Sequence, residues 1–208
     1  MQAYDDFLLR VQDIHKFSSL QGHLGWDQEV LMPPKGGESR GEILAWLAGK
    51  RHEQLTEPEM GSLLERLESE ELDADQYANV REMRRAYDQA VKLPKEFVEA
   101  FAKARSASLV AWQEARAASD FSMFKETLET LIEMTRTKIA YLGVTSTPYD
   151  VLLDEYEVGM TVADYDPLFQ GLKERLVPLL HSITHAQQHQ TAPQLPDGLR
   201  FSIPGQER

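Results

Sequence analysis

The amino-acid sequence predicts an all-α protein, a multi-helix array of amphipathic helices, and three observations support this prediction. Apolar residues recur every three or four positions along most of the 208-residue chain, so that they share one face of successive helices. Proline, glycine and short acidic stretches separate these periodic segments, at the places where helices begin and end. No run of alternating apolar and polar residues, bounded by turn residues, indicates a strand.

The first two predicted helices flank a stiff Pro33-Pro34 hinge. The helix before the hinge continues towards Trp26, and its apolar face consists of Tyr4, Leu8, Val11, Ile14 and Phe17. The second helix runs from about Ser39 to Leu55, and its apolar set consists of Ile43, Leu44, Trp46 and Leu47. Because a Trp side chain buries a large apolar area, we expect Trp26 and Trp46 to form the surface on which later helices pack.

Three helices are predicted in the middle of the chain. A short one follows Pro58, and its apolar positions are Met60, Leu63, Leu64 and Leu67. After an acidic connection, Asp73 or Asp75 can cap the next helix, whose apolar stripe is Tyr77, Val80, Met83, Tyr87 and Val91. Pro94 suits the first turn of the third helix, which carries Phe97, Phe101, Ala104, Ser108, Trp112 and Ala115.

The remaining helices are predicted from similar signals. Asp120 can cap a helix that ends at Gly143 and buries Phe121, Phe124, Leu128, Leu131, Ile139 and Leu142. A short helix is expected over Tyr149–Tyr156. Thr161 with Asp164 resembles a capping box that starts the last helix, and Asp166-Pro167 is the alternative start. This helix carries Leu168, Leu172, Leu176, Leu179 and Ile183, and Pro178 should kink it. We divide the chain into a helical region, residues 1–189, and a Pro-rich loop, residues 190–208.

Composition excludes several classes of function. The formal net charge is −12, which disfavours nucleic acid as a partner because phosphate backbones attract basic proteins. Cysteine is absent, so the chain has no disulfide and no thiolate that could bind metal or attack a substrate. The acidic N-terminus is not a signal peptide, and no apolar run approaches the ~18 residues of a membrane span. We therefore expect a cytoplasmic protein with no membrane partner.

Several segments carry a resemblance to a known family. The run LGWDQEVLMPPKGGESRGEILAWLAG at 24–49 resembles the N-terminal region of the carboxypeptidase Taq family of zinc metallocarboxypeptidases, and YDVLLDEYEVGMT at 149–161 resembles another stretch of that family. LPKEFVEAF at 93–101 and AWQEAR at 111–116 fit it too. The resemblance implies a mostly helical fold with a deep active-site groove, peptide substrates, zinc or another divalent metal, and commonly a homodimer. This segment would then supply a wall or lid of the groove.

The resemblance also implies a His-Glu-x-x-His metal motif, in which two His one helical turn apart bind zinc and the Glu acts as general base. His52-Glu53 begins this pattern, but Thr56 stands where the second His belongs. The segments 181–185 and 185–189 have the His spacing but lack the Glu. No residue of this chain can therefore be assigned as catalytic, cofactor-binding or metal-binding. We predict that those residues follow Arg208 in a longer protein, and that this chain alone is inactive.

His181, His185 and His189 could still bind a transition metal adventitiously, since they lie four residues apart. A solvated, polar helix end is the favoured interpretation, because no thiolate and no Glu accompany them in the last turn.

Three other patterns have an ordinary structural interpretation. Gly37–Gly41 matches the letters of a G-x-S-x-G nucleophile elbow, but no strand is predicted before it. The acidic residues Asp154, Glu155 and Glu157 could attract a cation, although a solvated helix face is favoured. Arg81, Arg84 and Arg85 form a small basic spot, and pairing within the helix, as of Arg84 or Arg85 with Asp88, explains it.

The C-terminal segment carries Leu195, Leu199, Phe201 and Ile203, apolar residues that require a surface to cover. In the resembled family this region leads into further structure, so we expect a fragment or a natural truncation. Such a chain should expose apolar surface and self-associate or form a homodimer. The alternative hypothesis is a non-catalytic helical protein-interaction module.

Overall fold

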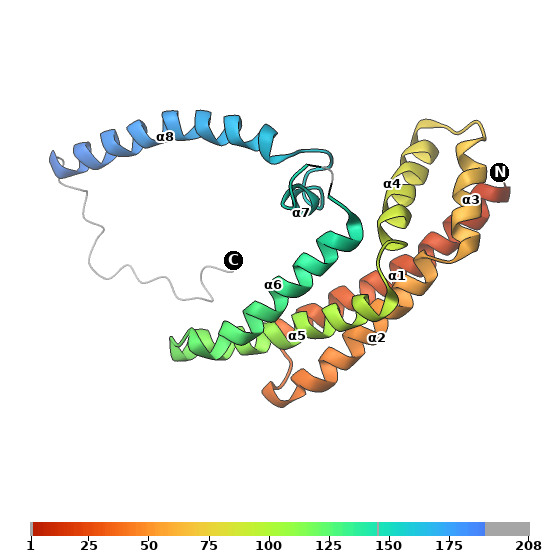
Figure 1. The fold of residues 1–208 in the computed structure, drawn as a ribbon, viewed down its shortest axis with the longest axis horizontal. Coiled ribbons are helices and arrows are strands. Elements are labelled where there is room, and N and C mark those ends of the chain that lie inside the picture. The colour runs from red at the N-terminus through yellow and green to blue at the C-terminus, as the bar shows by residue number, and fades with distance from the viewer. Residues whose placement is uncertain (1, 145, 190–208) are drawn as a thin grey trace, which may run out of the picture. The chain divides into compact units, whose positions relative to one another are not determined.

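A computed structural model describes residues 2–144 and 146–189 (Figure 1). In these two ranges all regular secondary structure is helical, which confirms the all-α prediction. The elements are α1 (Gln2–Val30), the short 3-10 helix η1 (Pro34–Gly36), α2 (Gly37–Leu55), α3 (Pro58–Glu68), α4 (Ala74–Ala90), α5 (Lys95–Ala118), α6 (Ser122–Leu142), α7 (Asp150–Leu153) and α8 (Val162–His189). The chain forms two compact units that divide between Val151 and Leu152, and each is described by itself.

The first unit contains α1 to α6. The helix α2 packs along α5, α1 packs against α2 and α3, α3 packs against α4, and α6 packs against α5. Figure 1 shows α1, α2 and α5 running beside one another, with α3 and α4 at the end that carries the N-terminus. The unit is therefore a helical array, in which α2 and α5 pack along each other although they are far apart in the sequence.

The hydrophobic core of this unit lies where α1, α3 and α4 meet the end of α2. Its buried members are Ala3, Phe7, Ile14, Leu55, Met60, Leu64, Leu67, Val80 and Ala90. The side chains of Met60, Leu64 and Leu67 on α3 are fully buried, which confirms the predicted apolar face of that short helix. Burying one such side chain contributes roughly 1.5–3 kcal/mol, so α3 contributes far more to the core than its length suggests.

The prediction that Trp26 and Trp46 organise the core is wrong, because both side chains are 57% exposed. The face of α2 that is buried contains Gly41, Leu47, Ala48, Gly49 and Leu55. Small residues on this face let the α2 and α5 backbones approach closely. Trp46 is next to Leu47 in the sequence, so its side chain points about 100° away from that of Leu47 around the helix axis. The close packing thus turns Trp46 towards solvent.

Other members of the predicted stripes also lie at the surface. Tyr77, Val91, Trp112 and Phe121 are exposed, and so are the α8 residues Leu168, Leu172, Leu176, Leu179 and Ile183. Periodicity correctly identified residues on a shared face, but these residues occupy helix ends or faces that no described element covers.

Most predicted helix boundaries agree with the structure. Asp73 and Gln76 form a reciprocal capping box at the start of α4. The N-cap of α6 is Phe121, one residue after the predicted Asp120. The carboxylate of Asp120 still accepts hydrogen bonds from the hydroxyl and the backbone N–H of Ser122, which lowers the pKa of Asp120. Gly143 ends α6 with φ +87°, a conformation that favours glycine.

In the second unit, Asp164 accepts hydrogen bonds from the backbone N–H and the hydroxyl of Thr161, so α8 begins at the predicted capping box. The alternative start is wrong, because Pro167 lies inside α8. Pro178 also lies within this helix. The helix predicted over 149–156 is shorter, since only α7 forms there.

Leu195, Leu199, Phe201 and Ile203, and the predicted boundary at 189–190, involve residues outside the described ranges. Within those ranges no helix combines the length and the apolar character that crossing a membrane requires.

Candidate functional site: a groove across α1, α2, α5 and α6

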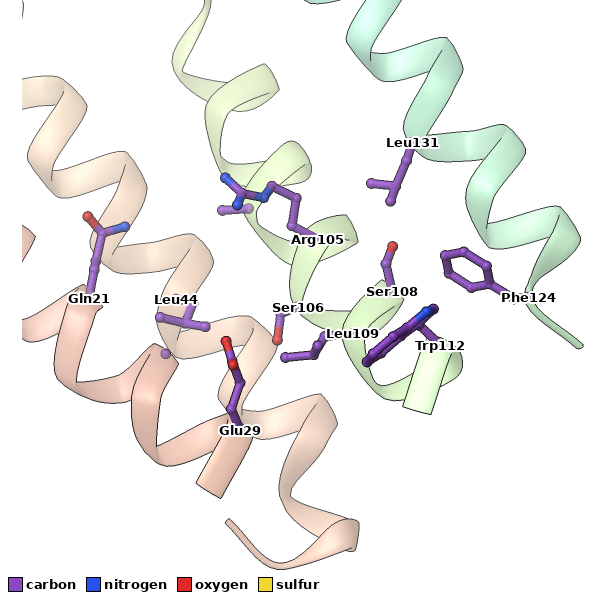
Figure 2. A pocket seen from close by; sticks show the side chains of 12 residues that line it. Gln21, Glu29, Leu44, Arg105, Ser106, Ser108, Leu109, Trp112, Phe124 and Leu131 are labelled. Atoms are coloured by element: carbon purple, nitrogen blue, oxygen red, sulfur yellow. The ribbon is translucent and has the colours of Figure 1, made fainter. Parts of the chain in front are cut away.

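The first unit contains an open groove of about 500 Å³ that α1, α2, α5 and α6 line together. Its apolar lining includes Leu44, Leu109, Trp112, Phe124 and Leu131. Figure 2 shows Trp112 and Phe124 on the side formed by α5 and α6, and Gln21 and Glu29 on the α1 side. The volume falls within the range of roughly 300–1,000 Å³ that is typical of small-molecule sites.

The helix α5 contributes the central lining because Arg105, Leu109 and Trp112 follow one another at helical spacing. The guanidinium carbon of Arg116 lies 5.4 Å from the centre of the Trp112 ring, a cation–π contact one turn further along the same helix. This contact orients the indole, which remains 42% exposed. The groove therefore exposes to solvent an aromatic ring, Trp112, that contacts the guanidinium of Arg116.

A reciprocal hydrogen-bonded pair joins α1 to α5 beneath the groove. The side-chain amide of Gln28 donates to the carbonyl of Ser106 at 3.1 Å, and the hydroxyl of Ser106 donates to Oε1 of Gln28 at 3.0 Å. Both residues are buried, with 7% and 6% exposure. On α2, a Cβ added at Gly41 would lie 3.6 Å from the Ser106 hydroxyl oxygen, so three helices meet at this pair.

A second connection ties the end of α1 to the start of α2. Arg40 donates hydrogen bonds to the carboxylate of Asp27 and to the backbone carbonyl of Leu24. The Arg40 side chain is largely buried, and it bridges the Pro33-Pro34 hinge. A buried, charge-assisted contact of this kind holds the hinge in one geometry.

The polar side chains of the groove fall into two groups, those with hydrogen-bond partners within the protein and those without. The hydroxyl of Ser108 donates to the carbonyl of Ala104, and Ser106 is committed to Gln28. Gln21, Glu29 and Arg105 make no side-chain hydrogen bond or ion pair with any residue that the structure describes. Arg105 and Glu29 are also exposed. The groove thus holds one positive and one negative group that are available to a ligand.

A charged cluster lies between α2 and α5. Hydrogen bonds from Lys50 and Lys95 lower the pKa of Glu53 to about 2, and the same Glu53 contact raises the pKa of Lys95. Lys95 also approaches Glu99 at 3.5 Å. A Cβ at Gly49 would overlap the side chain of Glu99, so a larger residue there would require Glu99 to move. These charges serve helix packing.

The residues that partly match the metal motif have structural partners. The Nε2 atom of His52 lies 3.0 Å from the carbonyl of Ala90, and Glu53 is held by two lysines. On α8, His181 and His185 are exposed, while the side chain of His189 lies outside the described residues. The hydroxyl of Ser182 donates to the carbonyl of Pro178. In the described ranges, no group of three or more His, Asp or Glu is arranged to hold a metal ion.

The G-x-S-x-G letters at 37–41 lie at the junction of η1 and α2, so a 3-10 helix precedes Ser39 where a nucleophile elbow requires a strand. In the basic spot, Arg84 pairs with Glu68 at 2.7 Å and with Asp88 at 3.7 Å, which confirms the pairing predicted with Asp88. The Glu68 contact raises the pKa of Arg84. Arg81 pairs with Glu82.

The acidic cluster also has a local structural role. Asp154 accepts a hydrogen bond from the backbone N–H of Gly159, which adopts φ +79° in the turn before α8. The predicted helix face is wrong for this cluster, because Asp154, Glu155 and Glu157 lie between the end of α7 and the start of α8. Asp154 is therefore a turn residue of the second unit.

These features place the chain among all-helical proteins, with an open groove on its surface and buried hydrogen bonds that join its helices. The family model for carboxypeptidase Taq (M32) metallopeptidases matches residues 6–208. The chain belongs to this family, as the resemblance implied.

Known proteins of this kind are similar over most of the chain. It is 35% identical over 183 residues to thermostable carboxypeptidase 1 of Pyrococcus furiosus, covering 88% of this chain and 37% of that protein. It is 34% identical over 194 residues to thermostable carboxypeptidase 1 of Thermus thermophilus, covering 87% and 38%. The BsuCP crystal structure matches with a TM-score of 0.84 and 31% identity, over 88% of this chain and 37% of that one. The chain thus spans less than two fifths of the length of these relatives.

Proposed function

We propose that this chain forms the N-terminal helical part of a metal-dependent carboxypeptidase, an enzyme that hydrolyses C-terminal residues from peptides. The observation that carries the proposal is the combination of family membership with a span of 37% of the relative from Pyrococcus furiosus. The hydrolysis of C-terminal residues is proposed because the relatives are named carboxypeptidases. In this account the longer protein supplies the groups that hold the metal and activate water, and this chain supplies helical scaffold.

The metal of the whole enzyme is zinc or another divalent cation in this proposal. The His-Glu-x-x-His motif that would hold it does not occur among the 208 residues. Support from the structure comes from the partial matches, because His52 and Glu53 are engaged in contacts between helices. We infer that this chain alone binds no catalytic metal and hydrolyses no peptide.

The groove across α1, α2, α5 and α6 is the part of the chain that we assign to the wall of a substrate cleft. Its aromatic lining and its uncommitted charges distinguish it from the charged cluster between α2 and α5, where the carboxylates already have lysine partners. Loose, exposed loops would make a poor wall, whereas the Gln28–Ser106 and Arg40–Asp27 contacts hold these helices together.

Self-association, including a homodimer, also belongs to this proposal. Trp26, Trp46 and Phe121 are each more than half exposed, and large exposed apolar side chains often mark contact surfaces. The absence of cysteine and the acidic charge favour a cytoplasmic enzyme that acts on peptides rather than on nucleic acid or membranes.

A non-catalytic helical interaction module is the alternative, and the same exposed Trp side chains favour it. The reading frame that encodes the chain distinguishes the two hypotheses. We expect codons for His-Glu-x-x-His to follow codon 208 in frame, and the complete product to release C-terminal amino acids from peptides in a metal-dependent manner. A stop codon directly after Arg208 in the native gene would overturn the proposal and favour the interaction module.

A further inference from the structure

The helix α8, which Figure 1 shows as one long helix, carries an apolar stripe that lies at the surface. At 100° per residue, six of its apolar side chains fall within an arc of about 120° around the helix axis. These residues are named the α8 stripe: Leu168, Leu172, Leu176, Leu179, Leu180 and Ile183. Their exposed fractions run from 43% at Leu172 to 63% at Leu180. An arc of this width is typical of a helix face that packs against another element.

The internal sequence of α8 increases the need for such packing. Pro178 lies within the helix, where proline removes one backbone hydrogen bond and crowds the preceding turn. Gly171 adds a further cost, because glycine loses more conformational freedom in a helix than other residues do. Most helical stability in proteins comes from burying an apolar face against another element. The α8 stripe is therefore the surface from which this helix can gain the stability that its sequence costs it.

The order of the stripe residues suits an antiparallel copy of the same helix. Leu172 and Leu180 lie four residues to either side of Leu176. Leu168 lies eight residues before Leu176, and Ile183 lies seven residues after it. The stripe thus has nearly the same spacing when it is read from either end. A twofold axis at Leu176 would place each half of one stripe on the opposite half of the other, which is the self-complementarity that a symmetric dimer requires.

The area and the charge of α8 also fit a contact between two copies. The exposed parts of the six side chains amount to roughly 600 Å² in each copy, so two stripes face to face exceed the ~1,000 Å² expected of a specific interface. Two chains with a net charge of −12 repel each other. The sequence of α8 contributes little to this charge, because it contains three acidic and two basic residues. Two acidic copies can therefore approach each other along α8.

We propose that two copies of the 208-residue chain associate by antiparallel packing of their α8 stripes, with Leu176 at the twofold axis. The inference names the surface of the self-association proposed above and rests on that part of the proposal, whereas it does not depend on the carboxypeptidase reaction. Because the contact supplies the packing that α8 lacks in one copy, dimer formation should also raise the helix content of the chain.

Sedimentation equilibrium of the purified chain measures the association. We expect a particle of twice the 23.7 kDa of one chain. Leu172→Glu and Leu180→Glu should each weaken dimerisation about tenfold or more, because the new carboxylate would be buried among apolar side chains without a partner. The matched control is His181→Glu, which introduces the same acidic group at an exposed position on the opposite side of α8 and should leave the Kd of the dimer unchanged. Circular dichroism measures the helix content of each variant.

Cross-linking tests the antiparallel orientation, and the chain suits it because it contains no cysteine. Oxidation of the single variant Leu176→Cys should join the two copies, since residues at the twofold axis come within the ~4.4–6.8 Å between Cα atoms that a disulfide allows. Two copies of Leu168→Cys would stand about 24 Å apart along the helix axes and should stay unlinked. A mixture of Leu168→Cys and Ile183→Cys chains should link, because only the antiparallel arrangement places these residues side by side.

Four results would overturn the inference. The first is a chain that stays monomeric at hundred-micromolar concentration; if Leu172→Glu then lowers its helix content, the stripe makes a contact within one chain. The second is a dimer that survives Leu172→Glu and dissociates in Trp46→Ala, which would assign the contact to the exposed Trp side chains. The third is equal cross-linking of Leu168→Cys and Leu176→Cys, and the fourth is no cross-linking of Leu176→Cys.

These outcomes are separate from the carboxypeptidase proposal, which the reading frame after codon 208 and metal-dependent hydrolysis decide. A dimer through α8 without a downstream metal motif would retain the interface and reject the enzyme. A downstream motif in a protein whose 208-residue part is monomeric would do the reverse.

Discussion

Gln28 and Ser106, 78 positions apart in the sequence, satisfy each other's polar groups in the interior between α1 and α5. The Gln28 amide donates to the Ser106 carbonyl, and the Ser106 hydroxyl donates back to the Gln28 side chain. Buried polar groups without partners are destabilising, so this pair favours one specific approach of the two helices.

Replacing Ser106 by Ala should destabilise the protein by about 1–2 kcal/mol, because the Oε1 atom of Gln28 loses its donor while it stays buried. Urea unfolding followed by circular dichroism measures the change. The matched control is Ser62→Ala on α3, whose exposed hydroxyl bonds only to the Pro58 carbonyl in its own helix and which should have little effect. Equal losses of unfolding free energy in Ser106→Ala and Ser62→Ala would contradict the stabilising role of the Gln28–Ser106 pair.

Gly61→Ala should destabilise the protein, although alanine normally favours a helix. A Cβ at Gly61 would lie 2.5 Å from the hydroxyl oxygen of Tyr87, whose ring packs against the core and lies under the Arg84 guanidinium. Overpacking of this kind costs typically 1–3 kcal/mol.

Gly171 on α8 provides the comparison, since a Cβ added there meets no atom within 4 Å. Gly171→Ala should therefore raise helix stability by roughly 0.5–1 kcal/mol. Thermal unfolding of the two variants should shift in opposite directions, and a shift of both in the same direction would refute the close contact at Gly61.

The Glu53 contacts should make stability depend on pH in acid. Two lysines lower the pKa of Glu53 from 4.5 to about 2, so the folded state binds its proton less readily than the unfolded state. The stabilising contribution is then fully present above pH 4.5 and is lost as pH falls towards about 2.

Glu53→Gln should therefore lose stability relative to the parent chain at pH 6, and the difference should shrink as the pH approaches 2. Because this carboxylate is exposed, salt should weaken the effect as well. Glu114→Gln on α5, which removes an exposed carboxylate without a described ion pair, is the control. A pH-independent difference would show that charge pairing does not act at this position.

Leu64→Ala should be among the most damaging single substitutions, with a loss of about 2–5 kcal/mol, because Leu64 is fully buried in the core around α3. Trp46→Ala removes a larger side chain but should cost less, since Trp46 is 57% exposed. Chemical unfolding of the two variants measures both losses. The reverse order would restore the sequence-based hypothesis that the core is organised around the Trp residues.

Much of this fold could be predicted from local signals in the sequence. The apolar spacing of Met60, Leu64 and Leu67, and the caps at Asp73 and Gly143, depend on neighbours within one turn, and the structure agrees with them. Whether an apolar face is covered depends instead on which helix approaches it. For this reason periodicity could not reveal that Trp26 and Trp46 lie at the surface.

The groove could be predicted only in part. Trp112 and Leu131 appear in the predicted stripes, but Glu29 and Arg105 look like ordinary solvated charges in a charged helical sequence. Their relation depends on the Gln28–Ser106 contact between α1 and α5.

We propose that this chain is helical scaffold of a metallocarboxypeptidase and contains no catalytic centre of its own. The most direct measurement incubates the purified chain with zinc and a short peptide and quantifies the released C-terminal amino acid, together with the zinc that stays bound after dialysis. We expect no release above the protein-free blank and no stoichiometric zinc. Release of C-terminal residues that rises with the zinc bound, and disappears with a chelator, would contradict it.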